Sequence, residues 1–113
     1  MRTIIAGSRG VIDYDSVLEA VVNAGFVISE VVSGTARGVD TLGEAIARDY
    51  SIPVKEFPAD WKKYGRKAGY IRNLEMAEYA DALIAVWDGF SPGTKNMINT
   101  AKALGLQVYI EVV

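Results

Sequence analysis

The hydrophobic residues of this sequence gather in short, nearly continuous runs, separated by longer stretches in which apolar and polar positions alternate at helical spacing. The short runs are rich in β-branched residues, which is typical of strands buried on both faces of a parallel sheet. They lie at Thr3–Ala6, Glu30–Ser33, Pro53–Phe57, Ala82–Trp87 and Gln107–Val112. We therefore expect each of the five runs to form a buried strand.

The four stretches between these runs repeat their apolar residues three or four positions apart, which predicts amphipathic helices. The third helix is expected over roughly 68–79 and the fourth over roughly 94–104. Gly25 and Gly105 are typical of helix C-termini, and Pro53 prevents the second helix from continuing. The residues expected on the buried sides are Val17, Leu18, Val21 and Val22 in the first helix, Val39, Leu42, Ala45 and Ile46 in the second, Ile71, Leu74, Ala77 and Tyr79 in the third, and Met97, Ile98, Ala101 and Leu104 in the fourth.

Strictly alternating strands and helices require right-handed crossovers, with helices on both faces of an open parallel sheet. We therefore predict one α/β domain over residues 1–113, a Rossmann-like three-layer sandwich with a five-stranded parallel sheet. A doubly wound strand order such as 3-2-1-4-5 is expected. In such sheets ligands bind beyond the carboxyl ends of the strands, so the loops that follow the strands are the place to look for function.

The composition narrows the chemistry. The chain has no cysteine and no histidine, which excludes disulfides, thiolate metal sites and the usual general base of serine and cysteine hydrolases. Twelve basic and fourteen acidic residues give a net charge of −2, which does not favour binding to duplex DNA. No apolar stretch approaches the ~20 residues of a membrane span and no secretory leader is recognisable, so we expect a soluble, cytoplasmic protein.

Three of the expected strand-to-helix turns are rich in glycine, serine and threonine: 7–10, 33–40 and 87–95. Glycine lets backbone N–H groups approach an anion closely, and a helix N-terminus adds free donors and partial positive charge. Short turns need such residues whatever the function, but three turns at one edge of a sheet favour anion binding. The P-loop and dinucleotide fingerprints are both absent. The candidate ligand contacts are Gly7, Ser8, Arg9, Gly34, Thr35, Arg37, Gly38, Asp40, Asp88, Gly93 and Thr94.

The remaining connection, residues 60–73, carries five basic residues and one acidic residue, with aromatic residues among them. This composition suits phosphate binding combined with stacking of a flat base, although a solvated, lysine-rich helix start would look similar. Arg72 is expected to face the ligand cleft, and Trp61 or Tyr64 to cover a base. Binding of single-stranded nucleic acid through this stretch is a further, less favoured hypothesis, which predicts a steep salt dependence.

Four segments in this order resemble the SLOG superfamily, and most closely its short YspA-type branch: Ile5–Arg9, Ser33–Asp40, Ile71–Met76 and Ser91–Ile98. The resemblance covers essentially the whole chain. It implies a Rossmann-like domain of bacterial or phage cytoplasm that binds nucleotides or nucleotide-derived ligands, often as a sensor. It also implies homodimers or larger homo-oligomers, and one DNA-uptake protein belongs to the superfamily.

The enzymes among these relatives are LOG-type phosphoribohydrolases, which cleave the N-glycosidic bond of nucleoside 5′-monophosphates. The resemblance places Arg72 on the arginine of their helix motif and Gly93 and Thr94 on their phosphate turn. Their catalytic glutamate is expected at position 96 or 97, where this chain has Asn96 and Met97. Cleavage of a glycosidic bond needs a carboxylate near the reacting carbon.

Our leading hypothesis is therefore a nucleotide-binding module without turnover. The alternative is a phosphoribohydrolase in which Glu75 or Asp40 serves as the working carboxylate. We predict no resident metal and no required cofactor. A Mg²⁺ ion could accompany a bound phosphate, with Asp40 or Asp88 as its contact.

Overall fold

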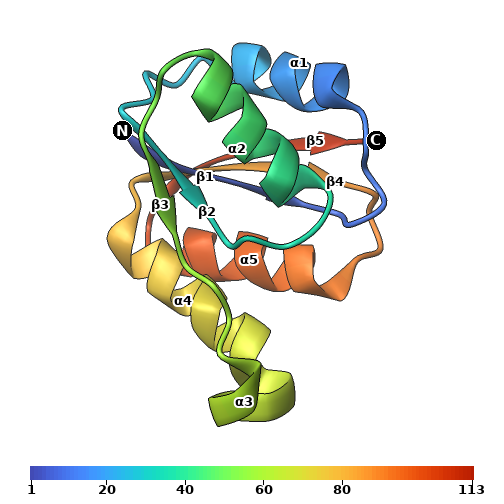
Figure 1. The fold of residues 1–113 in the computed structure, drawn as a ribbon, viewed down its shortest axis with the longest axis vertical. Helices are drawn as coiled ribbons and strands as arrows, with labels where there is room; N and C mark the ends of the chain where they lie inside the picture. Colours follow the sequence, from blue (N-terminus) through green and yellow to red (C-terminus); the bar gives the residue numbers. More distant parts are fainter.

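The computed structural model describes all 113 residues and contains one five-stranded parallel sheet in the order β3-β2-β1-β4-β5 (Figure 1). The strands are β1 (Arg2–Gly7), β2 (Glu30–Ser33), β3 (Val54–Glu56), β4 (Ala82–Trp87) and β5 (Gln107–Val112). The helices are α1 (Tyr14–Ala24), α2 (Val39–Asp49), α3 (Trp61–Tyr64), the 3₁₀ helix η1 (Gly65–Lys67), α4 (Ala68–Tyr79) and α5 (Pro92–Ala103). The predicted Rossmann-like α/β fold and strand order are confirmed.

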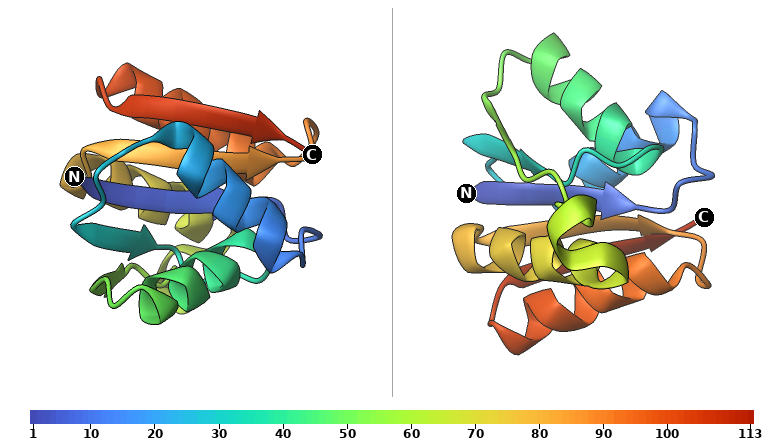
Figure 2. Two further views of the ribbon diagram at one scale, coloured as in Figure 1. Left: turned by 90° about the horizontal axis from the view of Figure 1, so that it is seen from above. Right: turned by 60° about the horizontal axis from the view of Figure 1, so that its bottom comes forward.

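The sheet lies between two layers of helices, with α1 and α2 on one face and α4 and α5 on the other (Figures 1 and 2). Successive residues of a strand point to opposite faces, so β1 contributes Ile4 to the α4–α5 side and Ile5 to the α1–α2 side. Both isoleucines are at most 1% exposed. Because β1 and β4 are central and parallel, their following loops meet at one edge of the sheet. No helix has both the length and the hydrophobicity of a membrane-crossing segment.

The expectation of five buried strands is wrong for β3. This strand is limited to Val54–Glu56, and all three of its residues are exposed. It lies at the edge of the sheet and pairs only with β2, so its outer side meets no further strand. β5 is the opposite edge strand and is only partly buried. The apolar run at Pro53–Phe57 marked a strand, but periodicity carries no information about position within the sheet.

Three residues predicted to face the core are exposed: Val22 by 69%, Leu74 by 45% and Leu104 by 48%. In α4 the buried side instead carries Asn73 and Met76, which are 6% and 1% exposed. Leu74 follows Asn73 and is therefore rotated by about 100° away from it around the helix axis. Apolar periodicity alone favours Leu74 as the buried residue, because it cannot indicate that a polar Asn73 side chain is buried.

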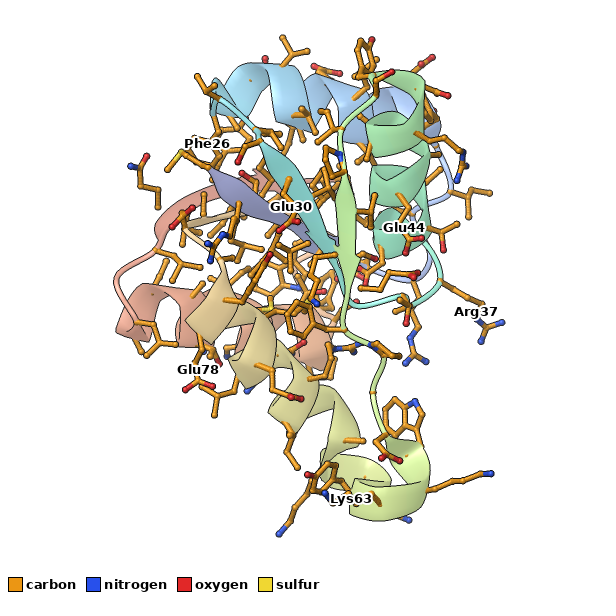
Figure 3. The ribbon with its side chains drawn as sticks, turned by 60° about the vertical axis from the view of Figure 1, so that its left-hand side comes forward. Phe26, Glu30, Arg37, Glu44, Lys63 and Glu78 are labelled. Carbon is orange, nitrogen blue, oxygen red and sulfur yellow. The ribbon has the colours of Figure 1, made fainter.

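The segment of α3 and η1 was not predicted. It projects from the body of the protein beyond the start of α4 (Figure 1) and has no buried residue. Asp60 caps α3 by accepting a hydrogen bond of 3.1 Å from the Lys63 N–H. Figure 3 shows Lys63 on this projection, far from the sheet. The segment is held by local hydrogen bonds more than by core packing, which is why apolar periodicity did not reveal it.

The close approach of β1 and β4 gives a first prediction. A Cβ atom at Gly7 would lie 1.9 Å from the Val86 carbonyl oxygen, whereas one at Gly10 would meet nothing within 4 Å. We expect Gly7→Ala to lower the free energy of unfolding by about 3 kcal/mol or more, since the neighbour is rigid backbone. Gly10→Ala should change it by less than about 0.5 kcal/mol. Urea denaturation of both variants tests this, and equal stabilities would contradict the strand packing described here.

Candidate functional site

The loops after β1 and β4 are joined by a hydrogen-bond network around Asp88. Its carboxylate accepts bonds of 2.8 Å from the N–H groups of Phe90 and Ser91 and another from the Ser91 hydroxyl. Ser8 Oγ accepts a 3.0 Å bond from the Asp88 N–H. The hydrogen bonds from the backbone N–H groups of Ser91, the largest cause, and of Phe90, the next largest, lower the pKa of Asp88 to about 2. Asp88 was a candidate ligand contact, but its carboxylate is engaged in shaping the β4–α5 loop.

A cavity of about 460 Å³ lies between these loops and the first turns of α4. It combines residues that are far apart in the sequence, since the carboxyl ends of the central strands meet here. Seven predicted contacts line it: Gly7, Ser8, Arg9, Asp40, Arg72, Gly93 and Thr94. Trp61 also lines it, as proposed for a base-covering residue, while Tyr64 does not.

The cavity is also lined by Arg66, Tyr70 and Asn73, which are not among the contacts predicted from the sequence. All three belong to the basic, aromatic connection, which was recognised as a whole without identifying the side that faces inward. Positions 66, 70 and 73 are four and three residues apart, which is the spacing of one helix face, so the sequence does contain a signal that could identify them as a group. The η1 turn at 65–67, which extends α4 backwards, is what brings Arg66 into line with Tyr70.

The helices that begin at the cavity lack side-chain caps. The N-terminus of α1 is capped by Asp13, whose carboxylate accepts a bond from the Asp15 N–H, but no side chain caps α2 or α5. At α5 the N–H groups of Gly93 and Thr94 have no partner within the protein. Free N–H groups at a helix start, with their partial positive charge, form a favourable position for an anion.

Thr94 adds a side-chain donor at the same position. The residue is 6% exposed and lines the cavity, yet its hydroxyl makes no hydrogen bond within the protein. No fully buried side-chain nitrogen or oxygen in the structure lacks a partner, so the Thr94 hydroxyl opens toward the cavity. A buried hydroxyl without a partner is costly unless water or a ligand satisfies it.

Arg72 is fixed by one acceptor in the loop after β2 and one on its own helix, α4. One guanidinium nitrogen donates to the Gly34 carbonyl after β2, and Nε donates a 3.1 Å bond to Asn73 Oδ1. Asn73 in turn donates 3.0 Å and 3.3 Å bonds to Asn96 Oδ1 and the Gly93 carbonyl. The Asn73 amide therefore connects Arg72 to the uncapped start of α5.

The second arginine of the cavity is unrestrained. Arg9 is exposed and makes no hydrogen bond within the protein, although it is close enough to Arg72 for their charges to repel. Burial lowers the pKa of Arg72, Asp40 opposes that shift and Arg9 adds to it. The two guanidinium groups thus create an excess of positive charge at the cavity that a bound anion would relieve.

Asp40 is the single carboxylate in the cavity wall, and it is 5% exposed. Burial raises its pKa to about 6, although the Ala36 N–H and the charge of Arg72 act in the opposite direction. Gly34 separates the two charged groups, because a Cβ there would be 2.7 Å from Arg72 Nη1 and 2.8 Å from Asp40 Oδ2. Glycine at position 34 is needed for this close approach.

A smaller cavity of about 260 Å³ adjoins the first, and the two share Arg9, Ala36, Trp61 and Arg72. The predicted contacts Gly34, Thr35 and Arg37 line only this smaller one. In Figure 3 the Arg37 side chain extends outward from the loop before α2. Gly38 lines neither cavity and packs against the backbone of Ser8 and Arg9.

The carboxylates required for hydrolysis are not gathered at the cavity. Glu75 is exposed on α4 and lines neither cavity. Asn96 is bonded to Asn73, and Met97 is 1% exposed in the core. No group of three or more histidine, cysteine, aspartate or glutamate side chains is placed to hold a metal ion. A Mg²⁺ ion at this site would depend on Asp40 together with oxygens of the ligand.

Comparison with known proteins gives one family match and one relative. The model of the YspA, cpYpsA-related SLOG family matches residues 1–64. The chain is also similar to the Gene 61 protein of Mycobacterium phage D29, with 33% identity over 119 aligned positions that cover 95% of this chain and 93% of the relative. No solved structure matches the sequence significantly.

The raised pKa of Asp40 predicts how stability depends on pH. Its pKa is 3.8 when unperturbed and about 6 in the fold, so the folded state binds the proton more tightly. The free energy of unfolding should therefore fall as the pH rises from about 4 to about 6, by up to about 3 kcal/mol. Asp40→Asn should remove this fall, making the variant more stable than the wild type at pH 7.5 but not at pH 4.

Chemical denaturation between pH 4 and pH 7.5 measures the effect. Glu78→Gln is the matched control, because Glu78 is an exposed carboxylate on α4 (Figure 3) that lines neither cavity. Its profile should parallel that of the wild type. A wild-type-like profile for Asp40→Asn would show that the burial of Asp40 does not control the titration.

Proposed function

The chain belongs to the YspA, cpYpsA-related SLOG family, and we propose that it binds a nucleotide or nucleotide-derived ligand in the larger cavity without converting it. The observation that carries this proposal is the convergence of Arg9 and Arg72 with the uncapped N-terminus of α5 on one cavity. This combination of fixed cations and free N–H donors is suited to a phosphoryl group.

The phosphoryl group would lie at the start of α5. There the N–H groups of Gly93 and Thr94 and the Thr94 hydroxyl are donors without partners in the protein. Arg72 would supply charge from a fixed position, and Arg9 would close over the anion from the β1–α1 loop. Hydrogen bonds to a charged group contribute about 1.5–3 kcal/mol each, so a few such contacts can support specific binding.

The nucleoside would extend toward the α3–α4 segment. Trp61 and Tyr70 line that part of the cavity and are 53% and 50% exposed, so their rings are accessible for stacking. Stacking of a base on an aromatic side chain contributes about 1–3 kcal/mol and discriminates little between bases. The aromatic wall therefore supports a nucleotide in preference to a bare phosphate.

We propose binding without turnover because of the side chains that the larger cavity offers to a bound nucleotide. A glycosidic bond requires a carboxylate, and the larger cavity offers only Asp40, whose Oδ2 accepts a 3.3 Å bond from the Ala36 N–H. A pKa near 6 is nevertheless suitable for acid or base catalysis. Asp40 thus makes nucleoside monophosphate hydrolysis the second candidate function.

Calorimetric titration with a panel of nucleotides tests binding. Arg9→Ala should weaken the affinity about tenfold or more, because a charged contact is lost, and the fold should be unaffected since Arg9 makes no hydrogen bond in the protein. Lys102→Ala is the control: it removes one positive charge at the far end of α5. Absence of binding by every nucleotide, or equal losses for the two variants, would contradict the proposal.

The catalytic alternative is tested separately by incubating the protein with AMP and measuring free adenine by chromatography. Under the leading proposal no adenine above background is released by the wild type or by Asp40→Asn. Release by the wild type that is lost in Asp40→Asn and retained in Glu75→Gln would replace the binding module with a hydrolase that uses Asp40.

A further inference from the structure

The two adjoining cavities differ in size in a way that bears on the ligand. Small-molecule sites usually have volumes of roughly 300–1,000 Å³. The larger cavity, about 460 Å³, is within this range, whereas the smaller one, about 260 Å³, is below it. Because Arg9, Ala36, Trp61 and Arg72 line both, the smaller cavity is best understood as an extension of the larger one.

All the charged residues that line the smaller cavity are basic. Arg9, Arg37 and Arg72 line it, and no aspartate or glutamate does. The chain as a whole carries more acidic than basic residues, 14 against 12, so this wall departs from the average surface. Three guanidinium groups, with Asp40 of the larger cavity as the one carboxylate acting on Arg72, favour a negatively charged occupant.

Each cavity has one arginine of its own. Arg66 lines only the larger cavity and Arg37 only the smaller, while Arg9 and Arg72 lie in the shared wall. The larger cavity has the uncapped start of α5 in its wall, and the smaller one is lined by residues 34–37 of the loop that leads into α2. Among these residues, Arg37 has a backbone N–H group without a partner within the protein. Each side of the Arg9–Arg72 wall therefore has one further arginine and at least one free backbone N–H group.

We propose that the ligand carries two phosphoryl groups that lie on either side of Arg9 and Arg72, one in each cavity. This inference rests on the proposed function and specifies its ligand class. The nucleoside and first phosphoryl group occupy the larger cavity, and the second phosphoryl group enters the smaller. The class is thus nucleoside diphosphates and their diphosphate-linked esters, rather than nucleoside monophosphates.

Titrations with AMP, ADP and ADP-ribose, on the wild type and two arginine variants, test this assignment. The wild type should bind ADP and ADP-ribose about tenfold or more tightly than AMP. Arg37→Ala should weaken ADP and ADP-ribose about tenfold and change AMP less than twofold. Arg66→Ala should weaken all three by a similar factor, and Lys102→Ala should weaken none. Both arginines are exposed, so neither substitution removes core packing.

Thermal shift with orthophosphate and pyrophosphate separates this proposal from the proposed function. Pyrophosphate should stabilise the wild type more than orthophosphate, and Arg37→Ala should remove the difference. If this holds while no nucleotide binds, the two-phosphoryl site stands and the nucleotide assignment fails. If nucleotides bind but AMP binds as tightly as ADP, or Arg37→Ala weakens both equally, the two-phosphoryl site is overturned and nucleotide binding stands.

Discussion

The contact between Arg72 and the Gly34 carbonyl is the constraint on which the site depends. A half-buried guanidinium needs acceptors, and here two neighbouring elements supply them: the loop after β2 and Asn73 on α4 itself. These bonds hold the charge at the carboxyl edge of the sheet and leave the remaining N–H donors of the group free. A Cβ at residue 34 would displace the Arg72 guanidinium from this position, so a backbone feature of one loop helps to fix the position of a charge on a distant helix.

Asp88 and Asp40 lie near the same edge of the sheet, but their different surroundings give them different roles. Asp88 receives backbone hydrogen bonds that keep its pKa near 2, so it is charged at every physiological pH and acts within its own loop. Burial raises the pKa of Asp40 to about 6, so its charge disappears in mildly acidic solution. When Asp40 is protonated, the net positive charge around Arg72 increases. The affinity of the cavity for an anion is thereby linked to pH through one side chain that need not touch the anion.

The sequence predicted the fold class, the strand order and seven of the 19 residues that line the larger cavity, because buried parallel strands and turn glycines have strong local signatures. It failed where the outcome depends on neighbours that are distant in the sequence. The exposure of β3 reflects its place at the sheet edge. Asn73 occupies the buried side of α4 in place of Leu74, because its side-chain NH2 group donates to Asn96 and Gly93 of another helix. Asp88 and Asp40 looked equivalent as loop carboxylates, and only the folded structure distinguishes a turn-forming group from a cavity-lining one.

The hydrogen bond between buried Asn73 and half-buried Asn96 links the asparagine at position 96, where the resemblance to phosphoribohydrolases implies a glutamate, to the architecture of the site. A neutral pair can be buried at little cost once each amide has a partner, and it transmits the position of Arg72 to the start of α5. A carboxylate at position 96 would bring a negative charge next to the donors that are meant for a phosphoryl group. In a binding module that charge would oppose the ligand, whereas an amide leaves the helix start attractive to anions. The substitution that argues against hydrolysis is therefore also one that favours retention of the anion.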